Sequence, residues 1–143
     1  MTDRRLAVEA WENLFRAQHE IFTDISKDFL DSSLQQGEYD VLLTVVRGSD
    51  HTARLRDITG NLLISQPSVS RLVDKMVARG LVTKCSDPED GRGALVTATD
   101  DGVHAFRAVA VQHGRSIARR MSALTNDELA TLKALTTKLR ATS

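Results

Sequence analysis

The side chains best suited to specific chemistry lie between residues 65 and 92. One stretch there combines hydroxyl and amide groups with two cations, and its candidate residues are Ser65, Gln66, Pro67, Ser68, Ser70, Arg71 and Lys75. Further along, Arg92 lies between two glycines in a segment rich in turn-forming residues. Guanidinium and ammonium groups bind phosphate, and guanidinium and amide groups pair with base edges. These residues therefore predict contact with a nucleic acid, while an ordinary solvated surface is the alternative for each of them.

A second set of candidates combines aromatic rings with a cation near the N-terminus. Four of the six Phe, Tyr and Trp residues fall within the first 30 positions. Rings can form the wall of a ligand pocket, and an arginine can pair with a carboxylate on the ligand. The candidate effector contacts are Trp11, Phe15, Arg16, His19, Phe22 and Tyr39. Aromatic residues at helical spacing equally suit a core or a subunit interface, which is the alternative.

Other kinds of site have little support in the sequence. The four histidines share no ligand spacing and the chain has one cysteine, so we expect neither a metal ion nor a disulfide. No Gly-rich phosphate loop or nucleophile motif is present, so we expect no enzyme activity and no cofactor. Cys85 leaves an oxidant-sensing role open, although a lone cysteine on a strand is more often unreactive packing.

The hydrophobic pattern indicates the elements that must position these residues. Apolar residues recur at helical spacing in the segments 5–30, 37–47, 54–61, 66–79 and 100–122. Thr125 and Glu128 have the spacing of a capping box before a final helix. Ser65 is the predicted N-cap of helix 66–79, and Gly80 is its predicted stop. Thr99 is expected to cap helix 100–122.

The segment after Gly80 predicts a β-hairpin. Two β-prone runs, 81–85 and 94–98, flank a loop of about eight residues. The order helix, short connection, helix and hairpin is that of a winged helix-turn-helix. We expect helix 66–79 to enter a major groove, and Arg92 at the loop tip to reach a minor groove. Asp87 and Asp90 are expected to cap the turn or to hold Arg92.

Composition suits one globular domain and excludes several classes of protein. The chain has 143 residues, of which 41% are hydrophobic and 27% charged. No apolar run is long enough for a membrane helix and the start does not resemble a secretory signal, so we expect no membrane association and a cytoplasmic location. The formal net charge is zero, but segments 1–53, 54–97 and 98–143 carry −5, +2 and +3. DNA binding requires local positive charge, which this distribution allows.

Four motifs resemble the MarR family of bacterial transcription regulators. They are Ser65–Val73, Arg79-Gly80-Leu81-Val82, Asp87-Pro88-Glu89-Asp90-x-Arg92 and Thr99-x-x-Gly102. The flanking helices also match in length and order, and Gly91 departs from the family pattern, which usually has arginine there. The resemblance implies one domain over 1–143, mainly α-helical with a β-hairpin wing. Within it, 1–34 and 100–143 would be dimerisation helices and 35–99 the winged DNA-binding lobe.

The expected function follows from these residues together with the resemblance. We expect a dimeric transcriptional regulator that binds pseudo-palindromic double-stranded DNA, a repressor released by a small aromatic or phenolic effector. One alternative is an oxidant-sensing regulator that acts through Cys85. The other is a winged-helix homodimer that contacts only proteins, which the neutral net charge and the single wing arginine keep open. A salt-dependent affinity for duplex DNA would separate the DNA-binding interpretation from the last alternative.

Overall fold

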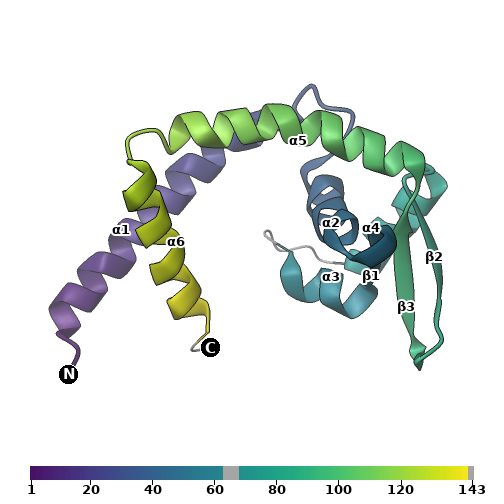
Figure 1. The fold of residues 1–143 in the computed structure, drawn as a ribbon, viewed down its shortest axis with the longest axis horizontal. Coiled ribbons are helices and arrows are strands. Elements are labelled where there is room, and N and C mark those ends of the chain that lie inside the picture. Colours follow the sequence, from purple (N-terminus) through teal and green to yellow (C-terminus); the bar gives the residue numbers. More distant parts are fainter. Residues whose placement is uncertain (63–67, 142–143) are drawn as a thin grey trace. The chain divides into compact units, whose positions relative to one another are not determined.

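A computed structural model describes residues 1–62 and 68–141 of the chain, which form two compact units. Unit 1 comprises Met1–Ile25 and His113–Ser143, and unit 2 comprises Ser26–Gln112. The fold is mainly helical with a small antiparallel sheet, which confirms the predicted fold class (Figure 1). Within the two described ranges, no helix is both long and apolar enough to cross a membrane.

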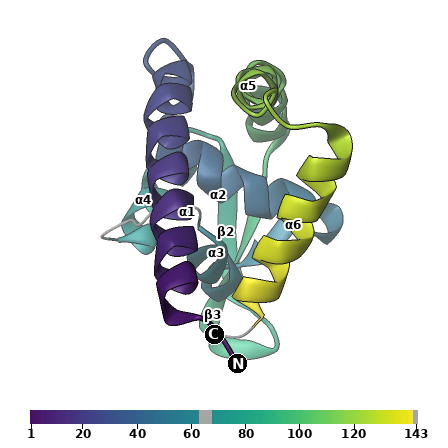
Figure 2. The ribbon, with the colours of Figure 1, turned by 90° about the vertical axis from the view of Figure 1, so that its left-hand side faces the viewer.

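Unit 1 is built from three helices. It holds α1 and α6 and the C-terminal part of α5, and their bounds are Arg4–Ile25, Asn126–Arg140 and Asp100–Arg120. Figure 2 looks onto α1 and α6, and the start of α1 and the end of α6 lie at the same end of this unit. The capping box before α6 is confirmed, because Thr125 Oγ1 accepts the Glu128 N–H at 3.2 Å and Glu128 Oε1 accepts the Thr125 N–H at 2.9 Å.

Unit 2 contains the sheet and the shorter helices. Its elements are η1 (Ser26–Phe29, a 3-10 helix), α2 (Gln36–Arg47), η2 (Ser49–His51, a 3-10 helix), β1 (Thr52–Arg54), α3 (Leu55–Asn61), α4 (Val69–Ala78), β2 (Val82–Asp87), β3 (Asp90–Ala98) and the start of α5. The first helix therefore ends five residues before the predicted residue 30. After Ile25 the chain tightens into η1, and the Phe29 ring packs on Tyr39 of α2 with centroids 5.4 Å apart.

The sheet has a third strand that the sequence did not predict. Its order is β1-β3-β2, and both pairings are antiparallel. Residues 52 and 53 lie between two predicted helices and Arg54 begins the second of them, but Thr52 pairs with Thr97 and Arg54 pairs with Leu95. The Thr52 and Thr97 hydroxyls also hydrogen-bond at 2.8 Å. The three residues of β1 show no alternation of apolar and polar side chains, and they form a strand because they pair with β3.

The hairpin differs from the predicted eight-residue loop. Pairing runs regularly from Val82–Ala98 to Ser86–Ala94 and then shifts, so that Asp87 pairs with Asp90 and the residues 91–93 lack a partner on β2. Asp87 Oδ1 accepts the Glu89 N–H at 2.9 Å, which closes a tight turn at Pro88 and Glu89. Arg92 therefore lies in a bulge of β3 rather than at the tip. In Figure 1 the hairpin extends beyond the helices of unit 2.

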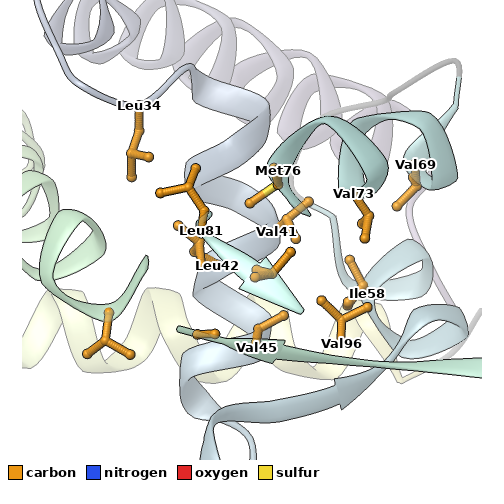
Figure 3. Packing of buried hydrophobic residues seen from close by; sticks show 13 residues of the cluster. Leu34, Val41, Leu42, Val45, Ile58, Val69, Val73, Met76, Leu81 and Val96 are labelled. Atoms are coloured by element: carbon orange, nitrogen blue, oxygen red, sulfur yellow. The ribbon is translucent and has the colours of Figure 1, made fainter. Parts of the chain in front are cut away.

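Unit 2 has one hydrophobic core, to which α2, α3, α4 and the sheet contribute. Figure 3 shows side chains from these elements pointing toward one another, and those fully shielded from solvent include Val41, Leu42, Val45, Ile58, Val73, Met76 and Val96. Burial of this apolar surface fixes α4 by one face. Val77, which follows Val73 by four residues and so has the spacing of that face, is 39% exposed.

The ends of α4 match the prediction in part. Gly80 follows the helix with φ +76°, a conformation that glycine adopts without strain, and so confirms the predicted stop. The helix begins at Val69, and its N-cap is Ser68, whose Oγ accepts the Arg71 N–H at 3.3 Å. The predicted cap, Ser65, lies outside the described residues.

The start of α5 explains the spacing Thr99-x-x-Gly102. Thr99 Oγ1 accepts the Gly102 N–H at 3.0 Å and donates to the Gly80 carbonyl at 2.6 Å, which confirms Thr99 as the cap. A Cβ on Gly102 would lie 2.0 Å from the carbonyl oxygen of Leu81. A side chain is therefore excluded where α5 meets the segment between α4 and β2.

Arg79 joins the end of α4 to the start of α2, and its loss should destabilise unit 2. It forms an ion pair with Glu38, whose side chain is only 4% exposed, and donates to the Ser33 carbonyl at 3.0 Å. Arg79→Ala would leave a buried carboxylate without its counter-ion, so we expect a loss of about 2 kcal/mol in the free energy of unfolding. Urea denaturation measures this, and Arg79→Lys should restore part of the loss. An unchanged midpoint in Arg79→Ala would contradict the role given to the pair.

Candidate nucleic-acid interface

The outward face of α4 carries most of the predicted nucleic-acid contacts that the structure describes. Ser70, Arg71 and Lys75 are exposed there, opposite the buried Val73 and Met76. The fold therefore presents both cations to solvent, as the helical spacing predicted. Ser68 has a structural role as the N-cap. Three further predicted contacts, Ser65, Gln66 and Pro67, lie outside the described residues.

A groove of about 630 Å³ lies beside this face, between α3, α4 and the hairpin. Ser70 of α4 and the predicted wing residue Arg92 both line it, so the fold brings two sequence candidates together. Its other lining residues are Arg54, Leu55, Arg56, Thr59, Lys84, Asp87, Asp90, Gly93 and Ala94. Four cations thus meet in a concave surface that is lined by two acids as well.

Three of these cations were missed in the sequence analysis. Arg54, Arg56 and Lys84 have no spacing that links them to one another or to the predicted contacts. Arg54 reaches the groove because β1 pairs with β3, and that strand was not predicted. For Lys84, the one available signal was the alternation of side chains between the two faces of β2. This alternation places Lys84 on the same side of the strand as Val82.

Ion pairs connect the walls of the groove. Arg54 Nε lies 3.0 Å from Asp87 Oδ2, and the same guanidinium also pairs with Glu89. Lys84 Nζ lies 3.1 Å from Asp74 Oδ1 of α4. Among the described residues, the cations that form no ion pair on this side are Arg56, Arg71, Lys75 and Arg92. These four are available for an anionic ligand.

The two aspartates of the hairpin have the predicted roles. Asp87 Oδ1 caps the turn through the Glu89 N–H, and Asp90 Oδ1 accepts the Arg92 N–H at 3.1 Å. The backbone of Arg92 is therefore held while its side chain is exposed. Cys85 is also exposed on β2, where it pairs with Leu95, so it is not packed in the core.

Five of the six predicted effector contacts belong to α1 of unit 1, and Tyr39 belongs to α2 of unit 2. Trp11, Phe15, Arg16 and His19 line one hollow of about 370 Å³ on α1, together with Glu12 and Glu20. The Trp11 and Phe15 rings lie 5.6 Å apart between centroids. This hollow brings aromatic rings and a guanidinium together, as the effector interpretation requires. Phe22 is not among its lining residues.

Tyr39 belongs to unit 2, whereas the residues of the α1 hollow belong to unit 1. Its ring stacks on Phe106 with centroids 5.2 Å apart and contacts Phe29 on another side. Burial raises the pKa of the Tyr39 hydroxyl above its usual value of 10.0, so this group stays neutral at physiological pH.

Comparisons with known proteins agree with this geometry. The family model described as "MarR family" matches residues 32–93. The HTH-type transcriptional regulator YkoM of Bacillus subtilis (strain 168) is 30% identical over 126 residues, which cover 85% of this chain and 80% of YkoM. The matched segment of the family model includes α2, α3, α4 and most of the hairpin.

Solved structures extend the agreement to nearly the whole chain. Sco3205, a MarR family transcriptional regulator from Streptomyces coelicolor solved in complex with DNA, has a TM-score of 0.81 at 16% identity, with 98% of this chain and 89% of that chain covered. BpsR of Bordetella bronchiseptica, whose DNA binding is regulated by 6-hydroxynicotinic acid, has a TM-score of 0.73 at 25% identity, with 90% and 91% covered. With a relative aligned over most of both chains and a matching fold, this chain belongs to the MarR family of transcriptional regulators.

Proposed function

We propose that unit 2 binds double-stranded DNA and that the chain is a dimeric repressor released by a small aromatic effector. The observation that carries the proposal is the exposed face of α4 beside a groove lined by four cations from β1, α3 and the hairpin. A helix with an adjacent wing is the arrangement by which winged helix-turn-helix proteins contact a major groove and the neighbouring backbone. The complex of Sco3205 with DNA supports the same mode of binding.

The predicted nucleic-acid contacts take distinct roles in this proposal. Arg71 and Gln66 would read base edges, while Ser65 and Lys75 would contact phosphates. The small residues Pro67, Ser68 and Ser70 allow the helix to approach the DNA closely. Arg92 would reach the minor groove or the adjacent backbone, and Arg56 and Lys84 would add phosphate contacts from the groove walls.

The surface of unit 1 supports the dimer. Neither α1 nor α6 has a buried residue among those described, and Leu6, Leu135 and Leu139 are 62%, 56% and 61% exposed. An apolar surface of this kind is usually covered by a partner, and a second copy would bury it symmetrically. Two lobes would then read half-sites about one helical turn apart, on the order of 10 bp.

The α1 hollow supports an aromatic acid as the effector. Arg16 would pair with the carboxylate while Trp11 and Phe15 contact the ring. The regulation of BpsR by 6-hydroxynicotinic acid, an aromatic acid, favours the same class of ligand.

Fluorescence anisotropy tests the proposal directly. The protein is titrated into a duplex from its own upstream region and into a scrambled duplex, at two salt concentrations. We expect tight, sequence-selective binding that weakens with salt, and release on addition of an aromatic acid. Failure to bind either duplex at low salt would overturn the proposal and favour the dimer that contacts only proteins. One observation favours that second candidate, because residues 26–112 hold 10 basic and 12 acidic side chains, a net charge of −2.

Removal of Arg92 should weaken DNA binding and reduce its salt dependence. If its guanidinium neutralises one phosphate, Arg92→Ala should reduce the slope of log K against log salt by about 0.9 and the affinity by about fivefold. The matched control is Arg107→Ala, which removes an exposed arginine of α5 that does not line the groove. An unchanged slope and affinity in Arg92→Ala would show that the hairpin bulge does not contact DNA.

A further inference from the structure

Arg54 has two carboxylate partners that differ greatly in their exposure to solvent. The Asp87 side chain is 4% exposed, lies 3.0 Å from Arg54 Nε and also accepts the Glu89 N–H. The Glu89 side chain is 77% exposed and pairs with Nη2 of the same guanidinium. An exposed ion pair contributes little free energy, whereas a buried carboxylate depends on its counter-ion. The pair with Asp87 is therefore a fixed part of the fold, and the pair with Glu89 is readily exchanged.

The guanidinium of Arg54 remains accessible from the groove. Its side chain is 35% exposed and lines the groove, whereas Glu89 is not among the lining residues. A phosphate oxygen carries the same sign of charge as a carboxylate oxygen and accepts the same N–H donors. A phosphate that enters the groove thus meets Arg54, whose Nη2 group already has the exposed carboxylate of Glu89 as its partner.

The position of Glu89 and the net charge of unit 2 make the ion pair with Arg54 relevant to DNA binding. Glu89 lies in the turn of the hairpin, next to the groove that the proposed function assigns to DNA. Because unit 2 has more acidic than basic side chains, each cation released from an internal partner changes its attraction for DNA appreciably. Weak binding to arbitrary sequences leaves more of a regulator free to find its own sites.

We propose that Glu89 is an intramolecular counter-ion of Arg54 that competes with DNA phosphate for its guanidinium, and that it thereby limits the affinity of the groove for duplexes of any sequence. The proposal rests on the proposed DNA binding. It assigns Arg54 as a phosphate contact and Glu89 as a positioning residue that acts through Arg54.

The test compares three substitutions in the full chain on a duplex of mixed sequence at one low salt concentration. Glu89→Gln should tighten binding about threefold, which is the range expected for loss of an exposed ion pair. Glu89→Asp keeps the charge but shortens the side chain by one methylene group, so it should also tighten binding. Asp57→Asn is the matched control, because Asp57 is an exposed carboxylate of α3 that forms no ion pair among the described residues and does not line the groove. This variant removes one negative charge from unit 2 outside the groove, so it should change the affinity less than Glu89→Gln does.

The outcomes distinguish competition between Glu89 and phosphate for Arg54 from long-range repulsion between the protein's carboxylates and DNA. Equal gains in Glu89→Gln and Asp57→Asn, with Glu89→Asp at the wild-type affinity, would overturn the proposal in favour of long-range repulsion. No gain in either Glu89 variant would show that phosphate does not compete for Arg54. All three substitutions are at exposed residues and should leave the melting temperature nearly unchanged. A variant that fails to fold would be recognised by a lowered melting temperature. A wild-type protein that binds no duplex would instead refute the proposed function itself.

Discussion

Gly102→Ala should lower the free energy of unfolding by about 4 kcal/mol or more, enough to unfold much of a marginally stable protein. The added Cβ would lie 2.0 Å from the Leu81 carbonyl oxygen and 3.0 Å from its carbon. These are backbone atoms of a residue that is only 7% exposed, and the same carbonyl accepts the Thr99 N–H at 3.0 Å. Relief of the clash would therefore require the cap of α5 to separate from the end of α4.

Gly114→Ala is a matched control on the same helix. A Cβ there has no neighbouring atom within 4 Å, so alanine should stabilise α5 by up to about 1 kcal/mol. Urea denaturation followed by circular dichroism measures both variants. A Gly102→Ala protein as stable as the wild type would contradict the close approach of α5 to Leu81.

The double substitution Leu135→Asp/Leu139→Asp should convert the proposed dimer to a monomer. The two leucines are 56% and 61% exposed, and their four-residue spacing places them on one side of α6. Two carboxylates on an apolar face that a second copy covers would have to be desolvated on association. Since a monomer would read only one half-site, we expect the affinity for a two-half-site duplex to fall about 100-fold or more.

The control for this prediction adds the same charges to the other side of α6. Ala130 and Thr137 are exposed and point about 140° to 160° away from Leu135 at 100° per residue, so Ala130→Asp/Thr137→Asp should remain dimeric. Sedimentation velocity gives the assembly state and anisotropy gives the affinity. If the leucine variant stays dimeric, α6 is not part of the interface. If it is monomeric but binds DNA as the wild type does, the dimer is not needed for recognition.

Features set by neighbouring residues could be predicted from the sequence. The caps at Thr99 and Thr125 and the stop at Gly80 depend on side chains and backbone groups within a few residues. The inward face of α4 follows from helical spacing, and Val69, Val73 and Met76 are buried as expected. The exposed cations Arg71 and Lys75 follow from the same spacing.

Features set by distant residues were missed or misplaced. The strand β1 exists because β3, a distant segment of the chain, pairs with it. Arg54 meets Asp87 across 33 positions of sequence, so no local pattern could place it at the groove. Tyr39 stacks on Phe106 within unit 2, and no local pattern indicates a contact between residues so far apart in the sequence.

The residues 91–93 without strand partners also bear on how the hairpin can change in length. Pairing is regular as far as Ser86 and Ala94, and the turn is closed separately by Asp87 and Asp90. An insertion or deletion between these two anchors would alter how far the hairpin extends without shifting any pair nearer the core. The bulge is therefore a position at which evolution or protein engineering can adjust the length of the arm while the rest of the sheet keeps its register.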